Sequence, residues 1–459
     1  MAYFQTRGIV EGFYGKEWTW KQRRDVVSFA GDIGYNLYIY APKIDLFHRE
    51  NWREMYDQAF CDKFSELIKT GAAHGVDISM AVSPGLSLVY SDQKELDILK
   101  QKYLEFSRLG VKTISIFLDD IPEKLVHEGD IRKYASLADA QSDFVNRLYD
   151  ALKDEIEGLK MILCPTPYHG ETVGPYHFTL GKHLYKEIEI MWTGPQVCSE
   201  KIPLKNVEMA AEAFGRDIMI WDNFPVNDSV MVPELHIGLY KGREKTMYER
   251  CTGLVINPMN QPYASLLTLK NIKKYMDNPS DYCPAEALKE TIKEMYPEFW
   301  KAYLCFAQAN DVSPVNPGEP EKAAEMKNLF DGFWKNGKLP ELSELLGKRA
   351  EMIAGAYEKI TEHADEDLKG DIGDWLQEFG IYGELLMKLS VLVAMIEIVY
   401  KDEHPEHDKI LSMRQAIKET EAVLRKTVDF RTRVFGSSIR EYAFETLITC
   451  KGLLRLVDF

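Results

Sequence analysis

Short apolar runs alternate with helical segments along residues 7–280, and this alternation restricts the possible folds more than any other feature of the chain. Each run is bounded by turn-forming residues and is rich in β-branched or aromatic side chains, as in strands buried on both faces. We interpret these runs as strands: RGIVEGF from Arg7, NLYIYAPK from Asn36, VDISMAVSPG from Val76, VKTISIFLDDI from Val111, LKMILCPTPY from Leu159, IEIMWTGP from Ile188, RDIMIWDNF from Arg216 and TGLVINPM from Thr252.

The segments between these runs have the apolar periodicity of amphipathic helices. Clear examples are WTWKQRRDVVSFAGDIG from Trp18, FCDKFSELIKTGAAHG from Phe60, QKELDILKQKYLEFSRLG from Gln93 and LADAQSDFVNRLYDALKDEI from Leu137. Eight strand–helix units in a segment of this length predict an α/β fold, a closed (β/α)8 TIM barrel. A doubly wound open sheet is the alternative.

The remainder of the chain is predicted to be a separate helical domain. A turn-rich segment with two prolines, 277–284, precedes it, and helix-forming residues then recur at helical spacing. We therefore predict a barrel over residues 1–280 and a C-terminal all-α helical bundle over residues 281–459. Residues 339–364 and 381–400 are interpreted as bundle-core helices, although the second is apolar on several faces and would also suit a docking or dimer surface.

Composition excludes several classes of function. The net charge is −16, of which residues 281–459 contribute −10, so neither nucleic acid nor an acidic membrane is expected as a partner. No uninterrupted apolar run reaches the ~18 residues of a membrane span, and the first residues do not resemble a signal peptide. We expect a cytoplasmic protein, or a secreted one if a leader has been removed; the oligomeric state is left open.

Motifs for metals and nucleotides are missing from the sequence. The seven cysteines form no CxxC pairs, and the ten histidines form no HExxH motif, so neither a disulfide framework nor a zinc site is expected. The sequence also lacks a glycine-rich phosphate loop and a GxSxG elbow. We therefore expect no cofactor.

Polar and aromatic residues follow the predicted strands, where a barrel of this kind places its active site. These strand ends are Glu11–Gly15, Ala41–Lys43, Ser83–Gly85, Asp119–Ile121, Cys164–Tyr168, Trp192–Pro195, Trp221–Asn223 and Asn257–Asn260. Aromatic rings stack on sugar faces, and amides and carboxylates bind hydroxyl groups, so the composition of these ends suits a sugar.

Two adjacent acids, Asp119 and Asp120, end the fourth predicted strand. Two neighbouring carboxylates repel each other when both are ionised, so we expect the pKa of one to rise while the other stays low. Glycoside hydrolysis uses such a division between an acid and an ionised partner. The alternative is that the acids cap the next helix or face solvent.

The chain resembles the family 84 glycoside hydrolases, which are the O-GlcNAcases and related β-N-acetylglucosaminidases. The motifs that carry the resemblance occur in family order over about residues 5–280: RGIVEGFYG, NLYIYAPK, HRENWREMY, AVSPG, LDDI, CPTPY, WTGP, WDNFPVND and INPMN. The helical remainder resembles the bundle of these enzymes only in type and position.

This resemblance implies retaining cleavage of β-linked N-acetylglucosamine in which the 2-acetamido oxygen of the substrate attacks the anomeric carbon. The first acid of the family corresponds to Asp119, which would accept the acetamide N–H and stabilise the oxazoline-like intermediate. The second corresponds to Asp120, which would protonate the leaving oxygen and then deprotonate water. The resemblance implies no metal and no organic cofactor.

The resemblance also implies a set of sugar-binding residues. Gly12 would let the backbone approach a hydroxyl group, Lys43 would donate to one, and Tyr168 would bind near the reacting centre. The residues that would wall the N-acetyl pocket are Cys164, Thr193 and Trp221, and those that would bind the polar edge of the ring are Asn223, Asp228 and Asn257. After the lysine, where the family usually has two acids, this chain has Ile44-Asp45.

Two other functions remain as alternatives. An endo-acting, hyaluronidase-like β-N-acetylhexosaminidase would need an open cleft, whereas the short loops of this chain favour removal of one terminal residue. A non-catalytic glycan-binding barrel would keep the pocket without needing both acids, and both acids are retained here.

Overall fold

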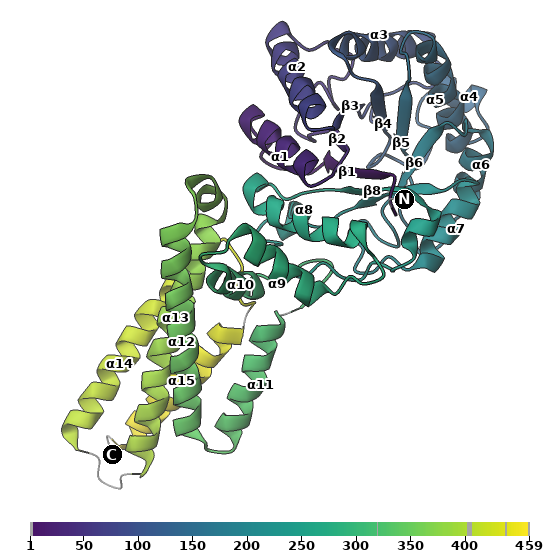
Figure 1. Ribbon diagram of the computed structural model, residues 1–459. Helices are drawn as coiled ribbons and strands as arrows, with labels where there is room; N and C mark the ends of the chain where they lie inside the picture. The colour runs from purple at the N-terminus through teal and green to yellow at the C-terminus, as the bar shows by residue number, and fades with distance from the viewer. Residues whose placement is uncertain (1–2, 319, 402–405, 437, 458–459) are drawn as a thin grey trace. The chain divides into compact units, whose positions relative to one another are not determined.

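The computed structural model describes residues 3–318, 320–401, 406–436 and 438–457, and it contains a closed barrel of parallel strands (Figure 1). Each strand pairs with its neighbour in sequence, and β8 pairs with β1 to close the ring. The strands are β1 Thr6–Glu11, β2 Leu37–Tyr40, β3 Asp77–Val82, β4 Thr113–Phe117, β5 Lys160–Cys164, β6 Ile188–Trp192, β7 Ile218–Asp222 and β8 Cys251–Ile256. The predicted TIM barrel is confirmed, and the alternative prediction of an open, doubly wound sheet is wrong.

Helices that follow the strands surround the ring (Figure 1). They are α1 Trp20–Asp32, α2 Gln58–Ala73, α3 Gln93–Leu109, α4 Glu128–Lys133, α5 Leu137–Lys153, α6 Pro175–His183, α7 Leu204–Phe214 and α8 Pro262–Asp277, with 3₁₀ turns η1 Ser229–Met231 and η2 Met247–Arg250. Local chemistry sets several helix starts, because the side chains of Thr19, Asp57 and Ser136 accept hydrogen bonds from the first turns of α1, α2 and α5.

The barrel core is apolar with a buried ion pair near its rim. Strand residues such as Val10, Ile39 and Phe117 pack in one cluster that also includes residues predicted for the site. Beside this cluster, the guanidinium of Arg23 on α1 donates to both carboxylate oxygens of Glu11 at 2.8 and 2.9 Å. A buried charge is tolerated only when it is paired, so this contact fixes α1 against the end of β1.

The rest of the chain forms a second compact unit made of helices. The chain divides into residues 1–229 with 240–287, and residues 230–239 with 288–459. The helices after the barrel are α9 Pro284–Met295, α10 Trp300–Ala309, α11 Glu321–Lys335, α12 Leu339–His363, α13 Glu366–Lys401, α14 His407–Lys426 and α15 Ser438–Val457. The predicted helical region is confirmed, while the boundary at residue 280 stays a prediction.

Part of the β7–β8 connection belongs to this helical unit. The carbonyl oxygen of Pro233 accepts hydrogen bonds from the Trp375 indole at 2.8 Å and from the Arg433 backbone N–H at 2.7 Å. The Leu239 backbone N–H donates to Asp311 Oδ1 at 2.8 Å. The helical unit therefore includes a segment that the chain supplies from between two barrel strands.

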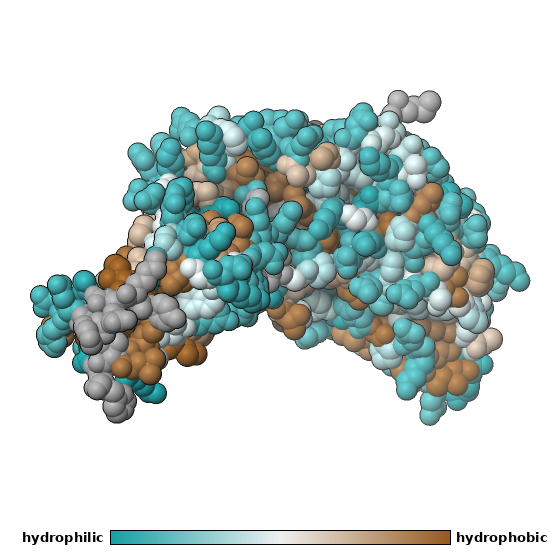
Figure 2. Space-filling view, turned by 90° about the horizontal axis from the view of Figure 1, so that it is seen from below, coloured by the Kyte–Doolittle hydropathy of each residue, from teal (hydrophilic) through white to brown (hydrophobic). Residues whose placement is uncertain are grey.

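The long helix α13 is apolar enough to cross a membrane by length and composition alone. Half of its most apolar window is buried within the protein, as in the core helix of a helical bundle. Met387 and Val391 on this helix, and Phe444 and Ile448 on α15, are exposed. Figure 2 shows hydrophobic groups distributed among hydrophilic side chains on the face that it views.

Candidate active site

The two predicted acids follow β4 directly, but they differ in burial and in partners. Asp119 is 4% exposed, and its Oδ2 accepts a hydrogen bond of 2.5 Å from the ammonium of Lys43. Its other carboxylate oxygen, Oδ1, is buried and has no hydrogen-bond partner among the described residues. Because buried polar atoms in proteins are normally paired, Oδ1 is suited to accept a hydrogen bond from a bound ligand.

Asp120 is more exposed, and two tyrosine hydroxyls hold its carboxylate. Tyr14 donates to Oδ2 and Tyr168 donates to Oδ1, each at 2.8 Å. The backbone of Asp120 has a φ of 53°, in the left-handed region that few residues other than glycine adopt. Such backbone conformations concentrate at functional sites, where the surrounding structure maintains them.

The pKa of Asp120 is lowered in this site. Burial alone would raise this pKa, but the charge of Lys43, the hydrogen bonds from Tyr14 and Tyr168, and the charge of Arg49 together outweigh it. Asp120 is therefore not the member of the pair whose pKa is raised. The pair of acids in the sequence gives no sign of Lys43, the cation that the end of β2 places beside them in the fold.

An apolar wall stands next to the acids. Cys164 and Trp221 belong to the buried cluster of the barrel, and the ring of Tyr168 packs against it. The Thr193 backbone N–H donates to the carbonyl oxygen of Tyr168 at 2.9 Å, which joins the ends of β5 and β6. The predicted wall residues are thus brought to one side of the site, with burial raising the pKa of the Cys164 thiol well above its ordinary value.

A chain of amide contacts continues from Trp221 of this wall. Asn223 Oδ1 accepts hydrogen bonds from the Trp221 indole and from Asn257 Nδ2, both at 2.8 Å. The Gly12 backbone N–H donates to Asn257 Oδ1 at 3.3 Å. These contacts bring together the carboxyl ends of β1, β7 and β8, as the barrel prediction required.

Asp228 completes the set. Its Oδ2 accepts a hydrogen bond of 2.8 Å from the backbone N–H of Tyr14. Burial raises the pKa of Asp228, although the Tyr14 N–H and the charge of Lys43 act in the opposite direction. Every residue predicted for the site therefore lies in one connected region of the barrel, but their individual roles stay predictions.

Two residues of this region were missed as site residues. Tyr14 lies in the EGFYG string that also contains Gly12. It is two residues after Gly12, and this spacing at a strand end could have indicated that both residues face the site. Arg49 lies in the HRENWREMY string, and its Nη2 approaches the Asp120 carbonyl oxygen at 3.4 Å. A lone arginine in a loop carries no signal of this contact, because the contact depends on the fold.

The loop after β2 is held by buried polar contacts. Asp45 accepts hydrogen bonds of 2.8 Å from the hydroxyls of Tyr40 and Tyr56, so the single acid after Lys43 orders this loop. The ammonium of Lys102 donates to the carbonyl oxygens of Phe47, Trp52 and Glu54. Burial lowers the pKa of Lys102 to about 8. These contacts order the loop that contains the HRENWREMY string and that follows Lys43.

Two acids at strand ends have structural partners instead of site roles. Glu11 is fully buried and pairs with Arg23, and Asp222 is buried and pairs with Arg243 and the Tyr240 hydroxyl. Within the described residues, no group of three or more metal-ligating side chains is found.

Comparison with known proteins gives the family. A protein-family model described as NAGidase, beta-N-acetylglucosaminidase, matches residues 7–308. The chain belongs to this β-N-acetylglucosaminidase family. The match covers all of the barrel strands except Thr6, the first residue of β1, and it includes every predicted site residue, so the resemblance inferred from the motifs is confirmed.

Relatives of this β-N-acetylglucosaminidase family member include proteins named Protein O-GlcNAcase from Rattus norvegicus and Mus musculus. Each is 35% identical over 257 residues, which is 55% of this chain and 28% of theirs. The chain thus spans little more than a quarter of the length of these relatives. A solved structure of a D120N mutant of Thermobaculum terrenum O-GlcNAc hydrolase is 33% identical and covers 99% of this chain and 97% of its own, with a TM-score of 0.94. Another, CpGH84B, is 25% identical and covers 97% of this chain and 77% of its own, with a TM-score of 0.85.

Gly12→Ala is expected to weaken substrate binding in this family member. A Cβ at this position would lie 2.6 Å from Trp221 Cζ2, and the indole is tied to Asn223, so it cannot move freely. We expect KM to rise and the free energy of unfolding to fall by about 1–3 kcal/mol, as for other overpacked sites. Steady-state kinetics and thermal melts measure both. Gly355→Ala, where no atom lies within 4 Å, is the matched control. Wild-type KM in Gly12→Ala would contradict the prediction.

Proposed function

We propose that this chain is a retaining exo-β-N-acetylglucosaminidase that removes terminal β-linked N-acetylglucosamine, of the O-GlcNAc type, with participation of the substrate's own acetamide group. The observation that carries the proposal is the contrast between the adjacent acids. Asp119 is buried and has an unpaired oxygen, whereas Asp120 is accessible and held by two tyrosines. The O-GlcNAcase and O-GlcNAc hydrolase names of the relatives support this substrate class.

In the first step, Asp119 Oδ1 accepts the acetamide N–H and so turns the carbonyl oxygen toward the anomeric carbon. This oxygen forms a bond to the anomeric carbon, and the glycosidic bond breaks with its electron pair moving to the leaving oxygen. Asp120 gives its proton to that oxygen. The carboxylate of Asp119 stabilises the positive charge that spreads over the resulting oxazoline-like ring.

In the second step, the Asp120 carboxylate takes a proton from water, and the water oxygen attacks the anomeric carbon. The bond to the acetamide oxygen breaks, the acetamide is restored, and Asp120 is protonated again. Two inversions at the anomeric carbon give retention. Because the pKa of Asp120 is low in the free enzyme, we expect it to take up its proton as the bound sugar excludes water from the carboxylate.

The proposal is tested with an aryl β-N-acetylglucosaminide. Purified protein is expected to release the phenol, and NMR of the early product is expected to show the β-anomer of N-acetylglucosamine. An α-anomer as first product would overturn the retaining mechanism. Absence of hydrolysis together with binding of the glycoside would favour the non-catalytic glycan-binding barrel.

Participation by the acetamide is tested with N-acyl groups of increasing fluorination. Fluorine withdraws electrons from the carbonyl oxygen and makes it a weaker nucleophile, so the rate is expected to fall with each added fluorine. A rate independent of fluorination would overturn participation.

With chito-oligosaccharides, release of single terminal residues supports exo-action, and internal cleavage favours the hyaluronidase-like alternative.

A further inference from the structure

A buried polar network lies behind the loop that carries Tyr168. Its centre is Gln141 on α5, which is fully buried. Gln141 Nε2 donates to Thr166 Oγ1 at 2.7 Å and to the Tyr90 hydroxyl at 3.0 Å, and Gln141 Oε1 accepts from the Tyr176 hydroxyl. All polar atoms of this side chain are therefore paired, as a buried amide requires.

Thr166 lies in the loop between β5 and α6, two residues before Tyr168. The Tyr168 hydroxyl contacts Asp120, and its carbonyl oxygen is held by the Thr193 backbone N–H. The loop is thus held at Tyr168 by the hydrogen bond from the Thr193 backbone. It is held two residues earlier, at Thr166, by the hydrogen bond from the Gln141 side chain. Tyr168 itself is only partly buried, so packing alone does not fix its hydroxyl.

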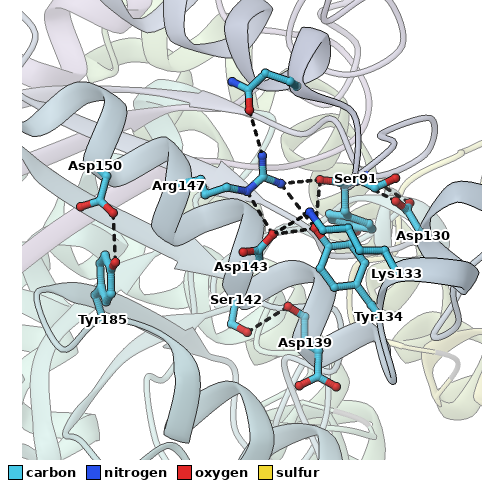
Figure 3. A network of polar contacts seen from close by, with 12 residues as sticks. Ser91, Asp130, Lys133, Tyr134, Asp139, Ser142, Asp143, Arg147, Asp150 and Tyr185 are labelled. Atoms are coloured by element: carbon cyan, nitrogen blue, oxygen red, sulfur yellow. Dashed lines mark hydrogen bonds and ion pairs between the residues drawn. The ribbon is translucent and has the colours of Figure 1, made fainter.

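The other side of the network is rigid as well. Arg147 lies six residues after Gln141 on α5. It donates to the carbonyl oxygen of Tyr90 at 2.6 Å and to Asp143 Oδ2 at 3.0 Å. Asp130 accepts hydrogen bonds from the backbone N–H groups of Tyr90 and Ser91. Figure 3 shows Arg147 in contact with Asp143 of the same helix, and Asp130 next to Ser91. Gln141 therefore extends from a helix whose position is fixed independently of the loop.

We propose that Gln141 is a positioning residue for the general acid and base, acting through Thr166 and the loop to hold the Tyr168 hydroxyl on Asp120. This proposal rests on the proposed function, because it assigns Gln141 a part in the same proton transfers. No part of the reaction occurs at Gln141, which reaches neither acid directly.

The physical consequence is a change in the titration of Asp120. A hydrogen bond donated to a carboxylate stabilises the charged form, so weakening the Tyr168 contact raises the pKa of Asp120. The first step needs protonated Asp120, and the pH dependence of kcat/KM reports the pKa values of the free enzyme. The alkaline limb of the kcat/KM profile therefore moves to higher pH when the pKa of Asp120 rises. The groups that face this carboxyl are Tyr14, Lys43, Arg49, Asp119, Tyr168 and Asp228. Substitution at Gln141 replaces none of them, and of these groups only Tyr168 is expected to change position.

The test uses Gln141→Leu and Thr166→Val, the second of which replaces a hydroxyl group with a methyl group of similar size. With an alkyl β-N-acetylglucosaminide, we expect kcat/KM at its optimum to fall roughly tenfold, a part of the ~10²–10⁴ that general acid–base catalysis contributes. We expect the alkaline limb of both variants to move to higher pH, as in Tyr168→Phe. Ser142→Ala on α5 loses only bonds to its own helix and is the matched control, with a wild-type pH profile.

A double-mutant cycle separates positioning from simple loss of stability. If Gln141 acts through Tyr168, adding Gln141→Leu to Tyr168→Phe causes little further change in kcat/KM or in the pH profile. Additive effects, or wild-type pH profiles in both Gln141→Leu and Thr166→Val, would overturn the proposal. Failure of the wild-type enzyme to cleave the glycoside would instead overturn the proposed function, so the two failures are distinguishable.

Discussion

Asp120→Asn is expected to lower kcat/KM for an alkyl β-N-acetylglucosaminide by roughly 10²–10⁴-fold, the usual contribution of general acid–base catalysis. An amide cannot protonate the leaving oxygen or accept a proton from water. The substitution keeps the size of the side chain, and both of its terminal atoms remain within reach of Tyr14 and Tyr168. The loss is therefore one of proton transfer and not of packing.

The leaving group discriminates this role from a structural one. A dinitrophenolate departs without protonation, so its release by Asp120→Asn is expected to be much less impaired than release of an alkoxide. The pH profile of the variant is also expected to lose its alkaline limb, since no carboxyl titrates at this position. Glu123→Gln, the same chemical change at an exposed acid three residues further on, is the control. Equal losses with good and poor leaving groups would contradict the assignment.

The barrel was predictable because its signals are local. Each strand is a short apolar run bounded by turn formers, and every predicted run overlaps a strand of the closed ring. The short polar helix α4 was not predicted, since six residues without an apolar stripe give no periodicity. Nor was the transfer of residues 230–239 to the helical unit, because their partners Asp311, Trp375 and Arg433 lie far along the chain.

The site was predictable in position but not in electrostatics. Carboxyl ends of parallel strands meet at one end of a barrel, so strand-end residues such as Lys43 and Asp119 had to converge. The sequence did not predict which acid of the pair has the lowered pKa, because this depends on which partners touch each carboxylate after folding. The left-handed backbone of Asp120 was also not predicted, because most aspartates that end a strand do not adopt it.

Asp119→Asn is expected to lower kcat by about 10²–10³-fold, the size of effect seen when a group that stabilises transition-state charge is removed. The asparagine oxygen can still accept the acetamide N–H, but it cannot oppose the positive charge on the forming ring. Attack by the acetamide accompanies departure of every leaving group, so this loss is expected with activated and unactivated substrates alike. Parallel losses would distinguish Asp119 from Asp120.

The same substitution leaves the Lys43 ammonium buried without its partner, since both side chains are almost fully enclosed. Breaking a buried ion pair on one side costs about 3–5 kcal/mol of stability, so thermal melts are expected to fall in Asp119→Asn. The double variant Asp119→Asn/Lys43→Met removes the unpaired charge and is expected to recover much of that stability. Activity is expected to stay low in the double variant, because the carboxylate is still missing. Recovery of activity along with stability would show that Asp119 acts only as the partner of Lys43.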